Sequence, residues 1–336
     1  MDKSGAYSYI YAKTSGILSK SFVGPKVEKL FEFKKLSDLW TILFNKPVPL
    51  LPEVLLAGAI EKEAFNNFLT QYSKILNLFD KPDEILKTQL AIYEVENLKE
   101  ISAALCAEEK TCPPLIDIGP FATIRKEYWP DLQKITENTE YSWYKVAPSI
   151  HQQQLMEYRL DEQFIRKVWM SAQKVKGEGK KALIEFVRED YSLRNIIWAL
   201  RLKVNYQFTK EEIMNELFYV TESANLEDPI ANGVLQIIDK QIDVYEDWFD
   251  WKYKSYLNPH VDGEVWCVSP SWIEKKARLM MNKKAMTLFH QYPLSTASIF
   301  AWSEIKQYEL TSIRTAVESI RLNINSDEAM KTVAVL

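Results

Sequence analysis

The sequence predicts an all-α protein, and three observations support this fold class. The chain has 336 residues but only 9 glycines, where average usage of about 7% would give about 24. Few glycines leave few tight turns and bulges, which disfavours sheet-rich folds. Apolar residues recur at steps of three and four, which is the helical period. No segment alternates apolar and polar residues for long, so we expect strands to be minor at most.

The first clear helix is expected from Ser149 to about residue 172. Ser149 and Gln152 form a capping-box pattern, and the residues after it repeat on one helical stripe. That stripe consists of Leu155, Tyr158, Ile165, Val168 and Ala172.

Two more helices are expected in the last quarter of the chain. Ser271 and Glu274 form a second capping-box pattern ahead of Ile273, Ala277 and Met280. The final helix has steps of 3, 4, 3 and 4 between its apolar residues, which are Leu310, Ile313, Val317, Ile320 and Ile324. Proline and glycine breakers divide the chain into helical hairpins; they cluster at residues 47–52, 112–114, 177–179, 258–259 and 292–293.

A nine-residue pattern occurs three times along the chain. It reads Tyr-x-(Leu/Val)-x-(Asn/Ser)-(Ile/Leu)-x-x-(Ala/Ile) and begins at Tyr93, Tyr191 and Tyr308. The fifth position holds Asn97, Asn195 and Ser312, and we expect these residues and the tyrosines to form the core of each repeat. The spacings of 98 and 117 residues suit whole domains. We therefore predict three similar helical domains in series, at 1–110, 111–222 and 223–336.

Composition narrows the function classes. The net charge of −4 and a pI near 5.7 disfavour nucleic-acid binding, which needs a basic face. Three cysteines are expected to be reduced thiols of a cytoplasmic protein. The longest uncharged stretch, residues 291–303, is too short for the roughly 20 residues of a membrane-spanning helix.

Catalytic motifs are weak. Gly177-Glu-Gly179 begins a match to the G-x-G-x-x-A dinucleotide pattern, but neither the strand before it nor the acid after it is present. We interpret it as a helix–helix turn. No acid stands isolated in an apolar segment, as an acid with a shifted pKa would. We therefore expect no cofactor and no catalytic residue.

One loop could gather metal ligands. His260, Asp262, Glu264 and Cys267 follow Asn258-Pro259, and their mixed chemistry could hold one ion. A polar loop without a metal explains the same residues, and we expect no metal there.

Two surfaces are candidates for docking a protein partner. Aromatic residues crowd the acid-rich stretch 239–256, including Trp248 and Trp251; the alternative is that they fill the core of a helix pair. The segment 275–284 holds five bases and no acid, including Lys275, Lys276 and Lys283. Such a basic run is usually a solvated helix face, and a docking surface is the alternative.

Several stretches resemble the C-type subunit of V/A-type rotary ATPases, whose eukaryotic counterpart is the d-type subunit. The C-terminal signature matches best, and the N-terminal helix and the second repeat add to it. These stretches are Pro293-Leu294-Ser295 through Trp302, Glu309 with Ser312-Ile313-Arg314 and Glu318, Tyr7 through Lys13, and Asn195-Ile196 through Lys203. Ser312 departs from the family, which usually has Asn there.

The resemblance implies a funnel of three similar helical domains around a pseudo-threefold axis. Such a subunit is not an enzyme. It lies on the cytoplasmic face of the membrane proteolipid ring, receives the end of the central shaft formed by the D and F subunits, and passes rotation between the ATP-driven head and the ring. An unrelated helical adaptor and an all-helical enzyme that uses the loop from His260 to Cys267 are the alternatives.

Overall fold

The protein is helical throughout the part of the chain that the computed structural model describes, residues 3–221, 227–261, 263–325 and 330, where no strand occurs. Ten α-helices and six short 3-10 helices follow one another in these residues. They are α1 (Lys3–Leu18), η1 (Gly24–Phe31), α2 (Leu36–Phe44), α3 (Glu53–Leu76), α4 (Glu84–Cys106), η2 (Gly119–Phe121), η3 (Lys126–Tyr128), α5 (Leu132–Thr136), α6 (Gln153–Lys174), α7 (Lys180–Tyr206), α8 (Lys210–Asn215), η4 (Asn232–Gln236), η5 (Tyr245–Trp248), η6 (Lys254–Tyr256), α9 (Pro270–Gln291) and α10 (Thr296–Arg321). The prediction of an all-α protein is confirmed.

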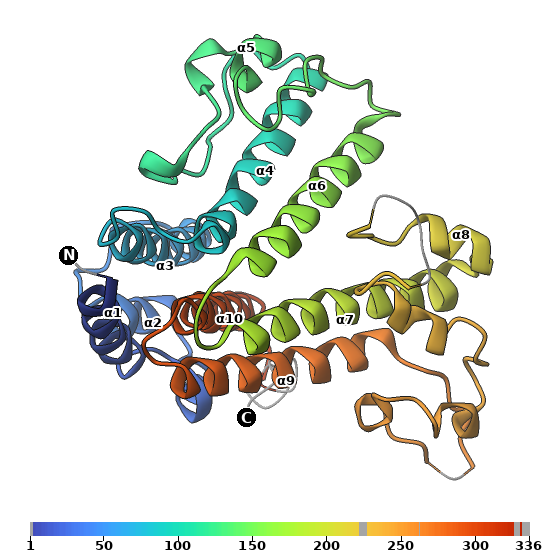
Figure 1. Ribbon diagram of the computed structural model, residues 1–336. Helices are drawn as coiled ribbons and strands as arrows, with labels where there is room; N and C mark the ends of the chain where they lie inside the picture. The colour runs from blue at the N-terminus through green and yellow to red at the C-terminus, as the bar shows by residue number, and fades with distance from the viewer. Residues whose placement is uncertain (1–2, 222–226, 262, 326–329, 331–336) are drawn as a thin grey trace.

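Six long helices form three pairs, each made of two helices that are not consecutive in the chain. Helix α4 packs along α6, α7 packs along α9, and α10 packs along α3. Figure 1 shows α4 and α6 rising together and α7 and α9 running together to the right, while α3 and α10 are seen nearly end-on. The last pair joins the final helix to the beginning of the chain, so the packing closes on itself.

The helices that carry the repeat pattern are α4, α7 and α10, and their first turns meet at one place, which we call the hub. The Thr296 hydroxyl at the start of α10 donates to Asp83, directly before α4. Lys174, at the end of α6, pairs with Glu84 at 3.0 Å. The tight turn before α7 packs on the start of α10. A Cβ added to Gly179 would lie only 2.8 Å from the Cβ of Ala297.

Gly177 and Gly179 form the turn between α6 and α7, as the sequence predicts. Both have left-handed backbones, with φ of 86° and 76°, which glycine adopts without the steric cost of a side chain. The dinucleotide alternative is thereby excluded, since a helix and not a strand precedes the turn.

The two ends of the chain share a hydrophobic core of their own. Side chains from η1, α2 and α3, including Leu30, Leu39 and Ile60, pack with Ile313 and Val317 of α10. All five are nearly or completely buried. The N-terminal segment thus completes the packing of the last helix, and the predicted division at residues 110 and 222 stays a prediction.

Two predicted helix starts are displaced. Helix α6 begins at Gln153, four residues after Ser149, and the Ser149 backbone and hydroxyl both donate to Gln152 in a turn ahead of the helix. Leu155 is consequently exposed. Helix α9 begins at Pro270, because Ser269 rather than Ser271 accepts the backbone N–H of Trp272.

The aromatic stretch 239–256 is not a helix pair, so that part of the prediction is wrong. It forms the short 3-10 helices η5 and η6. Nearby side chains compete for local partners, a known reason for helices to stop: Asp247 accepts the Gln241 backbone N–H and Asp250 pairs with Lys240. Helix α10 matches its prediction, except that Ile324 lies beyond its last residue.

Candidate functional site: the repeat helices and the hub cavity

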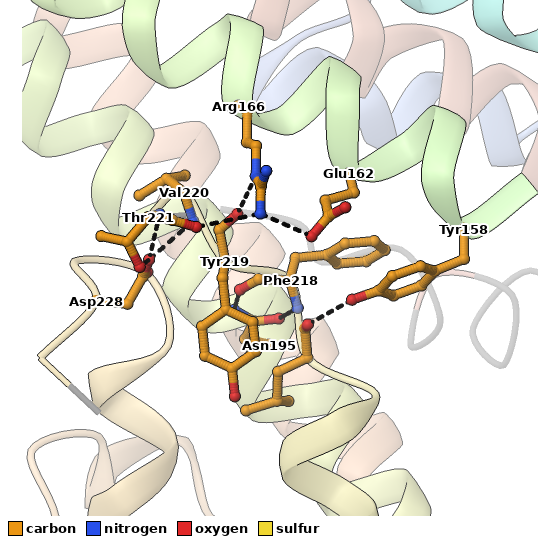
Figure 2. A network of polar contacts seen from close by, with 10 residues as sticks. Tyr158, Glu162, Arg166, Asn195, Phe218, Tyr219, Val220, Thr221 and Asp228 are labelled. Atoms are coloured by element: carbon orange, nitrogen blue, oxygen red, sulfur yellow. Dashed lines mark hydrogen bonds and ion pairs between the residues drawn. The ribbon is translucent and has the colours of Figure 1, made fainter. Parts of the chain in front are cut away.

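The second repeat holds an irregular backbone segment, residues 218–221, between α6 and α7 (Figure 2). We call this segment the strap, and we call the side chains that bind its backbone the clamp. Asn195 is 1% exposed, and its amide Nδ2 donates to the carbonyls of Phe218 at 2.9 Å and Ile230 at 3.0 Å. Its Oδ1 accepts the Phe218 N–H at 3.1 Å. One amide therefore pairs with both backbone groups of the half-buried Phe218.

Two further residues fix the same strap (Figure 2). Arg166 on α6 donates to the carbonyls of Tyr219 and Thr221, each at 3.1 Å. The fully buried Asp228 accepts the backbone N–H groups of Val220 at 2.8 Å and Thr221 at 2.9 Å. The strap is thus held from both helices of the pair and by its own returning chain.

The first repeat makes the same kind of clamp. Asn97 is 5% exposed, and its amide donates to the Ile116 carbonyl at 2.8 Å and accepts the Ile116 N–H at 2.7 Å. Glu94, one residue after Tyr93, is also buried and accepts the backbone N–H groups of Thr123 and Ile124. Asn97 and Asn195 therefore each bind both backbone groups of one residue in an irregular segment, in different parts of the chain.

The third repeat differs. Ser312 is buried, but its hydroxyl donates to the Tyr308 carbonyl of its own helix at 3.0 Å. Glu309, at the position of Glu94, accepts the backbone N–H of Phe22 at 2.6 Å and pairs with Lys306. The segment that α10 clamps is therefore the N-terminal one, and a carboxylate rather than an amide holds it.

Each helix pair also carries one ion pair between a base of the repeat helix and an acid of its partner helix. The three pairs are Lys99 with Asp161 at 2.7 Å, Arg201 with Glu274 at 2.6 Å, and Arg314 with Glu61 at 3.1 Å. Partly exposed pairs contribute little stability, on the order of 0–1 kcal/mol each, so their value lies in setting how the helices are aligned.

A cavity of about 400 Å³ opens between α7, α9 and α10. Its wall combines apolar residues such as Ile197 and Met281 with Trp198 and with the bases Arg194, Arg201 and Arg278. Trp, Tyr and Arg are the residues enriched at the centres of protein–protein interfaces. A second cavity of about 260 Å³ reaches α4 and shares Asp190, Arg194 and Glu304 with the first.

A polar cluster from all three repeat helices separates the two cavities. Arg194 and Asp190 pair on α7 at 2.8 Å, and Gln89 of α4 donates to Glu304 of α10 at 2.9 Å. Burial, reinforced by the nearby Asp190 charge, raises the pKa of Glu304 to about 7. An acid with a shifted pKa therefore does stand among apolar residues of α10, contrary to the sequence-based expectation. The raised pKa of Glu304 cannot be predicted from the sequence, because the residues around it come from three helices far apart in the chain.

The predicted docking residues fall into two groups. Trp248 and Trp251 lie in the core, at 0% and 2% exposure, so they offer no surface to a partner and the alternative of core aromatics holds. Lys275, Lys276 and Lys283 are on α9 but outside the cavity lining. Lys276 lies over the Trp272 ring at 5.5 Å, and Lys283 is exposed. A docking role for these lysines stays a prediction.

The loop after Pro259 has its own packing. The His260 ring stacks on Tyr245 with 5.1 Å between centroids, and Cys267 is exposed. Asp262 lies outside the described residues. No group of three or more metal-ligating side chains comes together in the described chain, and none of its helices is both long and apolar enough to cross a membrane.

Sequence reasoning found Asn97 and Asn195 through the repeat but missed the other side chains that hold the same segments, and it missed Arg194, Trp198 and Glu304. Trp198 leaves one signal, since it is a bulky residue within the apolar helical stretch 196–200, whereas Glu304 follows Ser298 and Ser303 in a mixed stretch and leaves none. Only the packing of the helices brings these residues to one cavity.

Comparison with known proteins places the chain in a family. A protein of Treponema pallidum (strain Nichols) described as uncharacterized is 27% identical over 313 residues, which cover 93% of this chain and 92% of that protein. The model of the ATP synthase (C/AC39) subunit family matches residues 10–332. Because this match covers nearly the whole chain, the protein belongs to the ATP synthase (C/AC39) subunit family and is a V/A-type ATPase subunit.

Proposed function

We propose that this protein is a non-catalytic rotor subunit that couples the D–F central shaft to the membrane proteolipid ring. In this role it transmits rotation between the ATP-driven head and the ion-carrying ring. The proposal extends the family membership to a specific place in the complex, on the cytoplasmic side of the ring.

The closure of the helix packing is the observation that carries the proposal. Helices α4, α7 and α10 each pack along a partner, and α10 returns to α3 at the start of the chain. We propose that the three pairs are similar units around a pseudo-threefold axis and form a funnel. A closed, stiff socket of this kind transmits torque without chemistry at any side chain.

The cavity between α7, α9 and α10 is the proposed place for the shaft end. Trp198 is 37% exposed at its wall, beside Arg194 and Ile197. An accessible aromatic ring, aliphatic side chains and guanidinium groups together suit a protein partner. The ion pairs along the helix pairs then keep the socket walls aligned under load.

Affinity capture tests the proposal. The tagged protein is isolated from detergent-solubilised membranes of cells that produce it, and the captured proteins are identified by mass spectrometry. We expect both shaft subunits and the proteolipid at a constant ratio to the bait. Capture of unrelated proteins without any rotary-ATPase subunit would identify the chain as an adaptor of another kind.

A further inference from the structure

The second cavity, of about 260 Å³, is lined by residues of five helices, α3, α4, α6, α7 and α10. Its wall is rich in aromatic rings, which include those of Tyr93, Phe164, Phe186, Tyr191 and Phe300. Pockets for drug-sized ligands measure roughly 300–1,000 Å³. This cavity is therefore the right size for a smaller molecule.

Two carboxylates share this wall with one base, as far as the described residues show. Asp190 pairs with that base, Arg194, at 2.8 Å. Glu304 forms no ion pair within the described chain and accepts one hydrogen bond, from the Gln89 amide at 2.9 Å. Burial and the nearby Asp190 charge oppose its ionisation and raise its pKa to about 7. A cation in the cavity would supply the counterion that Glu304 lacks.

Three hydrogen-bond acceptors on the wall have no donor among the described residues. They are the Oε2 of Glu304, the Oε1 of Gln307 and the hydroxyl oxygen of Tyr191. The Nε2 of Gln307 already donates to the Tyr93 hydroxyl, so its Oε1 faces outward from that contact as an acceptor. A ligand with several N–H groups would satisfy these atoms, and a primary ammonium group carries three.

The aromatic rings favour the same class of ligand. Phenyl and phenol rings attract cations to their faces, and ammonium ligands are bound in proteins in this way. The wall already contains one such contact, because the Arg194 guanidinium lies over the Tyr191 ring at 5.0 Å. An anion would instead meet two carboxyl groups and a base that is already paired.

We propose that this cavity binds a small organic cation of the primary alkylammonium class. The ammonium group is held by Glu304, Gln307 and Tyr191, and the alkyl chain packs on the phenyl rings. The site is separate from the cavity assigned to the shaft end, and the proposal does not rest on the rotor role.

Binding of the cation is linked to one proton. Glu304 must be ionised to pair with the ammonium group, so the proton that it carries at low pH passes to the solvent. Burial raises the pKa of the tyrosines around it above that of free tyrosine, so they stay neutral near pH 7, and α6 adds only apolar residues to the wall, as far as it is described. These tyrosines are Tyr72 of α3, Tyr93 of α4 and Tyr191 of α7. The remaining charges, Asp190 and Arg194, are paired with each other.

Isothermal titration calorimetry of the purified protein tests the proposal, with n-butylammonium chloride as the probe in amine-free phosphate buffer. 1-Butanol is the neutral control of similar shape. We expect one saturable site per chain for n-butylammonium at pH 8, and binding of 1-butanol that is weaker by about ten-fold or more. The affinity for n-butylammonium should fall about ten-fold between pH 8 and pH 6, because Glu304 changes from mostly ionised to mostly protonated.

A substitution separates the charge of Glu304 from the shape of the cavity. Glu304→Gln keeps the size of the side chain and removes the charge, and the exposed Glu100→Gln is the matched control. We expect Glu304→Gln to bind n-butylammonium about ten-fold more weakly at pH 8 and equally at both pH values, while the control behaves as the wild type. Circular dichroism establishes that both variants are folded.

Four outcomes would overturn the inference. Equal affinities for n-butylammonium and 1-butanol would show an apolar cavity without selectivity for a cation. Binding that is independent of pH and retained in Glu304→Gln would place the cation elsewhere. Displacement of the probe by an equal concentration of potassium chloride would identify a site for inorganic cations. A folded wild type that binds neither probe would refute the site outright. None of these results alters the rotor role, which the affinity capture tests separately.

Discussion

At the residue scale, the clamp amides decide how irregular backbone is held against the repeat helices. The Asn195 amide donates hydrogen bonds to two backbone carbonyls and accepts one from a backbone N–H. Replacing it with leucine leaves these groups unpaired, at roughly 1–3 kcal/mol each when buried. We expect Asn195→Leu to lower the free energy of unfolding by about 3 kcal/mol in urea titrations. Asn205→Leu, on the exposed surface of the same helix, is the control; equal losses in both variants would refute the clamp.

Glu304 gives the protein a pH-dependent stability. Its pKa in the folded protein is about 7, above the value of about 4.3 in an unfolded chain. The folded state therefore holds the proton more tightly, and this contribution is complete below pH 4 and is lost as pH rises through 7.

A neutral replacement should abolish that loss. We expect Glu304→Gln to be more stable than the wild type by about 3–4 kcal/mol at pH 8 and by only about 1 kcal/mol at pH 5. Urea titrations across this range measure the difference, with the exposed Glu100→Gln as control. A wild type whose stability difference from Glu304→Gln does not change with pH would contradict the raised pKa.

The residue scale also shows what the sequence can predict. The repeat pattern located Asn97 and Asn195, because a residue with the same role recurs at the same register. Glu304 escaped notice, since its pKa depends on Asp190 and on burial by distant helices. The sequence could not decide whether Trp248 and Trp251 belong to a docking surface or to the core, because aromatic residues suit both equally.

At the element scale, the turns at the hub are the most restrictive part of the fold. Gly177 and Gly179 both have positive φ, but only Gly179 is in close contact with the start of α10. We expect Gly177→Ala to cost about 1 kcal/mol and Gly179→Ala about 2–3 kcal/mol, since a left-handed backbone costs roughly 1–2 kcal/mol and the second variant adds a clash. Thermal unfolding of both variants measures the difference, and equal costs would mean that α7 and α10 are not in contact there.

The helices themselves were the most predictable elements, and their starts the least. Periodicity predicted α6, α9 and α10, whereas the capping patterns misplaced the N-caps of α6 and α9 by three residues and by two. Two serines near one helix start both suit a cap, and the tertiary path of the chain selects between them. Leu155, which the predicted helix places on its apolar stripe, is exposed.

At the scale of the whole molecule, the two ends of the chain fold against each other. Leu39, completely buried in the N-terminal segment, belongs to the same core as Val317 of α10. We expect Leu39→Ala to cost about 2–5 kcal/mol. Hydrogen exchange should accelerate in α10 as well as in α2 and α3, and much less in α6. Acceleration confined to residues 24–44 would show that the ends are not one cooperative unit.

The proposed rotor role concerns the assembled complex, and the cavity near the hub is where this proposal is tested most directly. A photo-crosslinking residue in place of Trp198, at the cavity wall, reports which protein lies there in isolated membranes. Met170, exposed and outside the cavity, is the control position. We expect position 198 to crosslink to a D or F shaft subunit and position 170 not to. Crosslinks from position 198 to the proteolipid, to proteins of no rotary ATPase, or to no protein in the assembled complex would contradict the socket.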